Sequence, residues 1–170
     1  AVTLAALLAA RRDPAAPVFV APSDHLVPDV PAFTQAVQSA AALAAAGDLV
    51  VFGVRPTEPT SAYGYIEPGE ALGVAGGHRV HRFVEKPDPD RAERLIAQGC
   101  LWNAGMFCFR PDAALREIEA LAPETLAHVR SALDTAGDDL DAVIVGEAFR
   151  AAPKISFDHA VMEKTARATV

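Results

Sequence analysis

Two apolar runs of strand length, with a helix between them, limit most strongly what this chain can fold into. The runs PVFVA (17–21) and DLVVFGV (48–54) carry almost no polar side chains, which is typical of parallel strands buried on both faces of a sheet. Residues 29–46 fit a helix that Asp29 caps and Gly47 ends. An alanine- and leucine-rich helical pattern precedes the first run. This order predicts an α/β fold with a mainly parallel, mixed sheet.

Shorter elements follow in the second half of the chain. We expect strands within 55–70 and 80–84, a helix at 88–99, a strand with a glycine kink at 101–110, two or three helices between 111 and 151, and a short strand or loop leading into a helical turn at 155–165. No repeat or flexible linker interrupts these elements. The length is about that of one domain.

The composition describes a folded protein with acidic charge. Of the 170 residues, 51% are hydrophobic and 22% are charged, and the formal net charge is −7. Such a charge argues against a general nucleic-acid binder. An anionic substrate then requires local cations, backbone N–H donors or a bound metal. No apolar run reaches the length of a membrane span.

The cysteines and the opening residues indicate the cellular compartment of the protein, and the two chain ends indicate whether the sequence is part of a longer one. Cys100 and Cys108 lie in apolar surroundings, which favours two free buried thiols over a disulfide or a metal pair. Arg11 and Arg12 follow the apolar opening, the wrong order for a signal peptide. We therefore expect a cytoplasmic protein. The chain begins without Met inside a helical pattern and ends in ATV, which looks like the start of a strand, so we expect 1–170 to be a segment of a longer protein.

Two aspartates lie at turns of the chain, and one of them follows a buried strand, where open α/β sheets bind ligands. Asp24 comes directly after the first apolar run, and Asp158 lies in SFDHAVMEK. Alone, each is explained as a turn or helix cap. One or two carboxylates together with substrate phosphates are the usual ligands of Mg²⁺. Both aspartates are therefore candidate metal ligands.

The run RFVEKPD (82–88) places two opposite charges at the mouth of an apolar strand. In a continuing strand Glu85 and Lys86 point to opposite sides, which argues against a simple salt bridge between them. A glutamate can accept hydrogen bonds from sugar hydroxyls, and a lysine can neutralise a phosphate. Pro87 fixes the backbone beyond them. An ordinary solvated strand end is the alternative interpretation.

Two further positions have the character of a ligand site. Asn103 is a polar amide within an apolar strand, where it is either satisfied structurally or faces a ligand. Gly64 lies between two tyrosines, where a missing Cβ would let a ligand approach the backbone, or where a bulge occurs. The five histidines show no metal-type spacing such as HxxxH.

Taken in order, these motifs closely resemble the mannose-1-phosphate guanylyltransferase family over the whole chain. The resemblance is carried by PSDH (22–25), FGVRPTEPTSAYGYIE (52–67), VHRFVEKPD (80–88), LWNAGMFCFRPD (101–112) and ISFDHAVMEKT (155–165). It implies a Rossmann-like, glycosyltransferase-A-like nucleotidyltransferase fold. It also implies an enzyme that forms GDP-mannose and pyrophosphate from GTP and mannose 1-phosphate with Mg²⁺.

The resemblance assigns roles by position. Asp24 and Asp158 match the family's Mg²⁺ carboxylates, and Lys86 matches its phosphate contact; these three would be the catalytic residues. Glu85 matches the acceptor for sugar hydroxyls, and Asn103 and Gly64 match groups that line the sugar site. The implied partners are small molecules, not nucleic acid or membrane, and a homo-oligomer is compatible with the sequence.

Departures from the family pattern are small within the motifs and large at the chain ends. Ser23, Ala62, Ala104 and His159 replace the family's usual Ala, Gly, Ser and Tyr. The family's glycine-rich nucleotide loop, its first βαβ unit and its C-terminal elements do not occur in 1–170. We therefore expect a partial nucleotidyltransferase domain that is inactive alone. Two alternatives stay open: a non-catalytic sugar-nucleotide-binding module of the same fold, and a nucleotidyltransferase for another hexose 1-phosphate.

Overall fold

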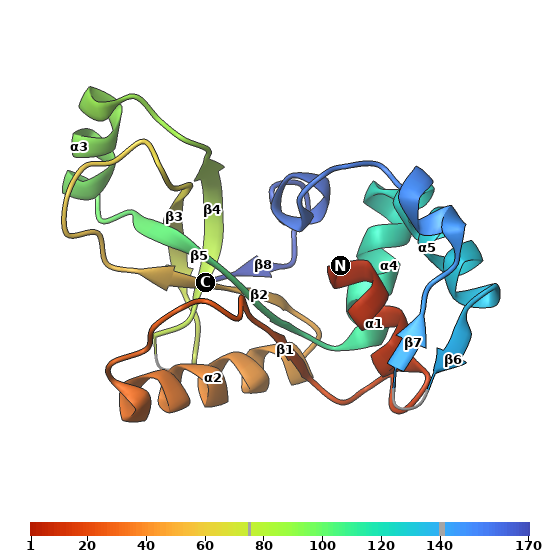
Figure 1. The fold of residues 1–170 in the computed structure, drawn as a ribbon. Coiled ribbons are helices and arrows are strands. Elements are labelled where there is room, and N and C mark those ends of the chain that lie inside the picture. The colour runs from red at the N-terminus through yellow and green to blue at the C-terminus, as the bar shows by residue number, and fades with distance from the viewer. Residues whose placement is uncertain (75, 140–141) are drawn as a thin grey trace. The chain divides into compact units, whose positions relative to one another are not determined.

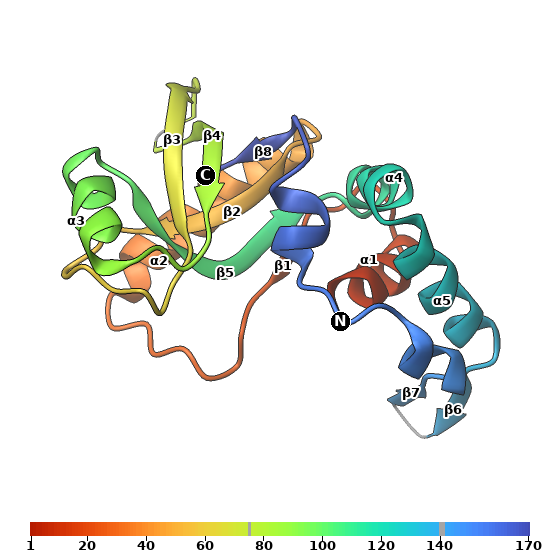
Figure 2. The same ribbon diagram turned by 90° about the horizontal axis from the view of Figure 1, so that it is seen from above.

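The computed structural model describes residues 1–74, 76–139 and 142–170 (Figures 1 and 2). The contacts between residues divide the chain into two compact units. Unit 1 consists of Ala1–Ala16 and Pro111–Thr165, and unit 2 consists of Pro17–Arg110 and Ala166–Val170. Each unit is described by itself below.

Unit 2 is built on a mixed six-stranded sheet. Its strands are β1 (Val18–Val20), β2 (Leu49–Val54), β3 (Tyr65–Ala71), β4 (His78–Val84), β5 (Leu101–Phe109) and β8 (Ala168–Thr169). They are ordered β1-β5-β2-β8-β4-β3, and β5 also pairs with β3. The predicted α/β fold with a mixed sheet is confirmed in this unit, whereas the expectation of a mainly parallel sheet is wrong, because most of the described strand pairs are antiparallel.

The pairing of the two apolar strands differs from the sequence-based expectation. β5 lies between β1 and β2 and is antiparallel to both, so β1 and β2 run in the same direction without being neighbours. Among the described strands, only β2 and β8 pair in parallel. The three residues of β1 are half-buried, and in β2 burial ends after Val51. An apolar run thus predicts a strand, but it does not specify which strand pairs with it or how deeply it is buried.

Helix α2 (Val30–Ala45) packs on the β1, β2 and β5 part of the sheet. Asp29 caps it, because its Oδ1 accepts a hydrogen bond of 3.0 Å from the N–H of Ala32. Gly47 ends it with φ 96°, a left-handed conformation that glycine adopts without strain. The buried cluster between helix and sheet contains Ala40, Leu43, Ala44, Val50 and Cys108.

Helix α3 (Pro89–Ala97) covers the β3 and β4 part of the sheet. Asp88 caps it, accepting a hydrogen bond of 2.9 Å from the N–H of Arg91. Its apolar side packs into a cluster made of Tyr65, Val84, Ala92, Leu95 and Cys100, with Trp102 beside it. The predicted capped helix is therefore confirmed, and its burial fixes the start of β3 and the end of β4.

The two cysteines are free and buried, as predicted. Burial raises the pKa of the Cys108 thiol to about 11 and also raises the pKa of Cys100, because the charged thiolate loses its hydration. Both thiols therefore stay protonated at neutral pH, which fits a packing role.

Unit 1 consists mainly of helices. Its elements are α1 (Val2–Ala10), α4 (Pro111–Leu121), α5 (Pro123–Asp134), the hairpin β6 (Gly137–Asp139) and β7 (Ala142–Ile144), a 3₁₀ helix (Glu147–Ala151) and a π-helical turn (Asp158–Met162). Helix α1 packs against α4 and α5, with Thr3 and Ala6 buried. The helices were predicted, whereas the hairpin was not.

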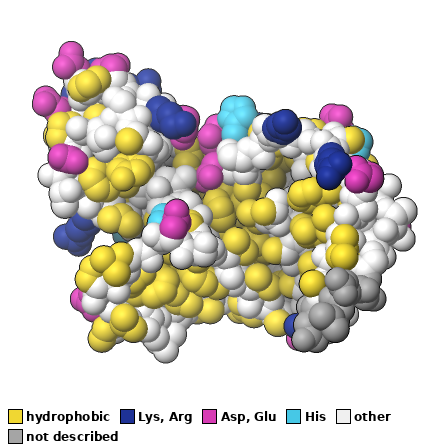
Figure 3. Space-filling view, viewed as in Figure 1, with side chains coloured by type: hydrophobic (Ala, Val, Ile, Leu, Met, Phe, Trp, Pro, Cys, Tyr) yellow, Lys and Arg dark blue, Asp and Glu magenta, His cyan; other side chains and the backbone are white. Residues whose placement is uncertain are grey.

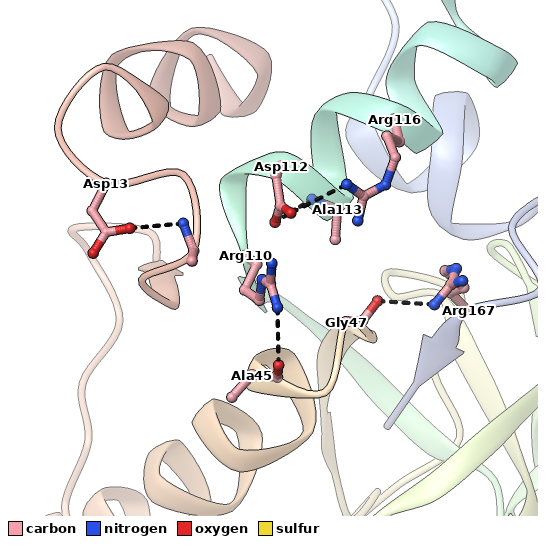
Figure 4. A network of polar contacts seen from close by, with 9 residues as sticks. Asp13, Ala45, Gly47, Arg110, Asp112, Ala113, Arg116 and Arg167 are labelled. Carbon is pink, nitrogen blue, oxygen red and sulfur yellow. Dashed lines mark hydrogen bonds and ion pairs between the residues drawn. The ribbon is translucent and has the colours of Figure 1, made fainter.

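Figure 4 shows polar contacts within each unit, at the ends of helices and in a loop. In unit 2, Arg110 and Arg167 donate to the carbonyls of Ala45 and Gly47, at 3.4 and 3.5 Å, where α2 ends. Cations there oppose the partial negative charge of a helix C-terminus. In unit 1, Asp112 at the start of α4 accepts from the N–H of Ala113 and pairs with Arg116 at 3.1 Å. Asp13 accepts from the N–H of Ala15 at 2.8 Å.

Much of the surface shown in Figure 3 is hydrophobic, with scattered charged side chains. The large apolar side chains that are exposed include Leu26, Val30, Val54, Tyr63, Val143, Ile144 and Ile155. None of the helices formed by the described residues combines the length and the hydrophobicity that a membrane span requires.

Replacing Gly53 by alanine should destabilise unit 2. A Cβ at Gly53 would lie 2.5 Å from Leu101 Cδ1 and 2.9 Å from Val170 Cγ2, so neighbouring strands would have to move. Overpacking of this kind costs about 1–3 kcal/mol of unfolding free energy, measurable by urea unfolding. Gly73→Ala is the control, because no atom of the described residues lies within 4 Å of its added Cβ. Equal stability of the two variants would contradict the packing argument.

Candidate functional site

A groove of about 950 Å³ in unit 2 contains two of the residues predicted from the sequence. Asp24 reaches it from the loop between β1 and α2, and Asn103 reaches it from β5. Most of the remaining lining is apolar and includes Leu26, Val54 and Tyr63, which are exposed. The groove therefore pairs an apolar wall with a few polar groups, as small-molecule sites do.

Asp24 is exposed, and its carboxylate has no hydrogen-bond or ion-pair partner within the described part of the chain. It lies in the bend that follows β1, and therefore beyond the carboxyl end of that strand. A carboxylate without a protein partner is available to a cation or a donor group of a ligand. This position agrees with the predicted location of Asp24.

Gly64, Glu85 and Asn103 lie together where β3 meets β4 and β5. The Gly64 carbonyl accepts a hydrogen bond of 2.8 Å from the N–H of Asn103. An added Cβ at Gly64 would lie 2.8 Å from Glu85 Oε2 and 3.8 Å from Asn103 Cβ. Asn103 Oδ1 accepts from the N–H of Gly105 at 2.9 Å. The structure thus brings these three predicted residues to one place.

The reason for glycine at position 64 differs from the one expected. The space that a side chain would fill is occupied by the Glu85 carboxylate, so the glycine lets Glu85 lie against the backbone. The approach of a ligand to this backbone stays a prediction. In this structure the missing Cβ leaves room for the carboxylate of Glu85.

The expectation that Glu85 and Lys86 do not pair with each other is wrong. Lys86 Nζ lies 3.5 Å from Glu85 Oε1. β4 ends at Val84, and Lys86 adopts φ 40°, so the alternation of a strand does not extend to it. Lys86 is the one non-glycine residue with positive φ among the described residues. Its side chain is 66% exposed and that of Glu85 58% exposed, and such a pair contributes little to stability.

Tyr63 and Trp102 form an aromatic pair beside these groups, and neither was predicted as a site residue. Their ring centroids are 5.1 Å apart with an interplanar angle of 57°, and both residues line the groove. The Trp102 Nε1 is buried without a hydrogen-bond partner in the described part of the chain. One indication in the sequence that these two residues belong to the site is that each directly precedes a predicted site residue, Gly64 or Asn103.

Asp158 belongs to unit 1, where it is the first residue of the π-helical turn. Its carbonyl accepts a hydrogen bond from the N–H of Glu163 at 2.9 Å. Next to it, the N–H of His159 donates to Ser156 Oγ, and His159 Nδ1 lies 3.1 Å from Glu163 Oε2. Asp24 lies in unit 2, so a metal site shared by the two aspartates stays a prediction.

The donor groups present fit a magnesium ion better than a transition metal. In the described residues no group of three or more His, Cys, Asp and Glu side chains is placed to hold a metal. Mg²⁺ requires fewer protein ligands, because it keeps water and uses substrate phosphates. The unpartnered carboxylate of Asp24 is a hard oxygen donor of the kind that Mg²⁺ prefers.

A family model described as nucleotidyl transferase matches residues 1–147. The chain belongs to this family. It is 43% identical over 155 residues to a mannose-1-phosphate guanylyltransferase of Sinorhizobium fredii, covering 90% of this chain and 30% of that protein. The chain spans about a third of the length of the curated relatives it matches.

Two solved structures share the fold. One is described as mannose-1-phosphate geranyltransferase from Thermus thermophilus, with a TM-score of 0.83, 34% identity, and coverage of 98% of this chain and 47% of that one. The other is described as mannose-6-phosphate isomerase from Helicobacter pylori, with a TM-score of 0.85, 30% identity, and coverage of 99% and 64%. These likenesses confirm the predicted α/β nucleotidyltransferase fold.

Replacing Gly64 by alanine should displace the Glu85 carboxylate while the fold is kept. The atom that the new Cβ meets is the end of a flexible side chain, so the loss of unfolding free energy should stay below about 1 kcal/mol. A crystal structure of the variant would show where the carboxylate lies, with Gly73→Ala as the control. A Glu85 carboxylate that keeps its place beside residue 64 would contradict the prediction.

Proposed function

We propose that the full-length protein forms GDP-mannose and pyrophosphate from GTP and mannose 1-phosphate. The observation that carries the proposal is the joint position of Gly64, Glu85, Lys86 and Asn103 at the β3, β4 and β5 junction, because it places a carboxylate and an ammonium near Asn103, which lines the groove. Membership of the nucleotidyl transferase family supports it. The names of the similar proteins agree on a mannose phosphate, with the phosphate at carbon 1 or carbon 6.

The reaction requires positioning and charge neutralisation more than covalent chemistry by the protein. A phosphate oxygen of mannose 1-phosphate attacks the α-phosphorus of GTP. The bond from the α-phosphorus to the oxygen that bridges to the β-phosphorus breaks, and pyrophosphate leaves with that oxygen. No proton transfer to a side chain is needed for the balance.

Glu85 and Lys86 would hold the two ends of the sugar phosphate. The Glu85 carboxylate accepts hydrogen bonds from sugar hydroxyls, and the Lys86 ammonium neutralises the phosphate. Their mutual ion pair at 3.5 Å is solvent-exposed and therefore weak, so a substrate can replace it at low cost. Asn103 and Gly64 would line the sugar side of the site.

Asp24 and Asp158 would hold Mg²⁺ together with the phosphates of the nucleotide. The ion would neutralise charge that develops on the phosphate oxygens. The protein contributes two carboxylates from distant parts of the sequence, and Asp24 has no competing partner among the described residues. We also propose a cytoplasmic location, because both cysteines are free.

The test is an assay of the purified full-length protein against four nucleoside triphosphates and three sugar phosphates. GTP with mannose 1-phosphate should give the highest kcat/KM, with release of pyrophosphate. Preference for glucose 1-phosphate or N-acetylglucosamine 1-phosphate would replace the proposal by its nearest alternative. Binding of GDP-mannose without turnover of any pair would favour a non-catalytic module.

Lys86→Ala should weaken use of mannose 1-phosphate far more than use of GTP. A charge-assisted hydrogen bond contributes about 1.5–3 kcal/mol, so kcat/KM for the sugar phosphate should fall at least about tenfold. Lys154→Ala removes the same charge from an exposed position outside the proposed site and serves as the control. Unchanged steady-state constants for the sugar phosphate would remove Lys86 from the site.

Asp24→Asn and Asp158→Asn should each raise the Mg²⁺ concentration needed for half-maximal turnover. The amide keeps the shape of the carboxylate and loses its charge, so circular dichroism and thermal unfolding should change little. Asp134→Asn, at an exposed position of α5, is the matched control. A Mg²⁺ dependence that is the same in all three variants would exclude a shared ion.

A further inference from the structure

The hydroxyl of Tyr65 makes two hydrogen bonds to the protein backbone that have no role in the proposed reaction. It donates to the carbonyl of Thr60 and accepts from the N–H of Thr60, both at 3.2 Å. One phenol thereby satisfies both backbone polar groups of a single residue in the loop that precedes β3. Such a doubly bonded side chain holds a backbone segment in one place.

The loop 55–64 depends on contacts of this kind. It joins β2 to β3 without regular secondary structure, and its two prolines, Pro56 and Pro59, have no backbone N–H to donate. The Thr60 Oγ1 accepts a further hydrogen bond of 3.2 Å from the N–H of Ala62. The contacts at Thr60 therefore order the residues that lead into Tyr63 and Gly64.

The ring of Tyr65 provides a fixed point for these bonds. Tyr65 is 0% exposed and is the first residue of β3, where its Cα pairs with both Val84 of β4 and Trp102 of β5. Its ring belongs to the cluster beneath α3. The hydroxyl is thus held by the core of unit 2, while the loop that it contacts carries site residues.

We propose that Tyr65 is a positioning residue that selects the hexose, because its hydroxyl fixes the loop whose end places Tyr63 beside Trp102 and Gly64 beside Glu85. This inference rests on the proposed function of the same site. It assigns the loop to the sugar side, since the Gly64 carbonyl accepts from the N–H of Asn103 and the backbone of Gly64 lies against the Glu85 carboxylate. Loosening the loop should therefore weaken sugar-phosphate binding and leave the chemical step intact.

The test is Tyr65→Phe in the full-length protein, which removes one oxygen and keeps the buried ring. Hydrogen–deuterium exchange should show faster exchange at the amides of Thr60 and Ala62, with β4 and β5 unchanged. The KM for mannose 1-phosphate should rise about tenfold, and the kcat/KM ratio of mannose 1-phosphate to glucose 1-phosphate should fall, while kcat and the KM for GTP change less than about twofold. Thr60→Ala, which keeps the backbone bonds to Tyr65 and loses the contact with Ala62, should show a smaller rise.

Several results would overturn the inference. An unchanged exchange rate at Thr60 would mean that the hydroxyl does not hold the loop. Faster exchange spread equally over β4 and β5 would mean general destabilisation. Faster loop exchange with an unchanged KM would remove the role in hexose selection. If the wild-type protein turns over no sugar phosphate, the proposed function and this selection role fail together, and the exchange result alone still decides whether Tyr65 anchors the loop.

Discussion

Strand β5 is the element on which the arrangement of unit 2 depends, because its backbone pairs with β1, β2 and β3. Its last residues, Phe107 and Cys108, pair with both β1 and β2, and its first residues pair with β3. Gly105, with φ 63°, separates these two parts. Asn103 lies just before this bend, so the hydrogen bonds of a partly buried strand determine where a polar group of the groove is placed.

The candidate site combines backbone groups held by hydrogen bonds with an exposed pair of charges. Backbone hydrogen bonds and buried rings hold Gly64 and Asn103 in place, whereas Glu85 and Lys86 are exposed and bonded to each other. In a chain with net charge −7, the Lys86 ammonium can neutralise a phosphate only when its exposed pair with Glu85 opens, and such an exposed pair opens at low cost. The charges act at the end of β4, which α3 fixes by packing on Val84.

Local features of the fold could be predicted from the sequence, and non-local ones could not. The caps Asp29 and Asp88 act within their own helices, so sequence spacing was sufficient to find them. The insertion of β5 between β1 and β2 joins strands about 50 to 90 residues apart, and an apolar run says nothing about such a neighbour. The pairing of β6 with β7 was missed because β6 consists of glycine and two aspartates, which are depleted in strands.

The candidate site was predicted through its motifs, and the contacts within it were not. The roles of Asp24 and Asp158 still come from the resemblance of their motifs. The ion pair of Glu85 with Lys86 depends on one backbone angle that strand alternation does not anticipate. The bond between Tyr65 and Thr60 depends on how a loop folds back onto a buried ring, for which spacing gives no signal.

The left-handed backbone of Lys86 has a consequence for any attempt to make this protein more robust. A non-glycine residue in this conformation costs about 1–2 kcal/mol, which glycine would avoid and asparagine would reduce. Selection for thermal tolerance alone would therefore favour Lys86→Gly or Lys86→Asn, and either change removes the ammonium. Laboratory evolution of this protein would thus have to select for turnover and heat resistance together, because at this position the two requirements favour different amino acids.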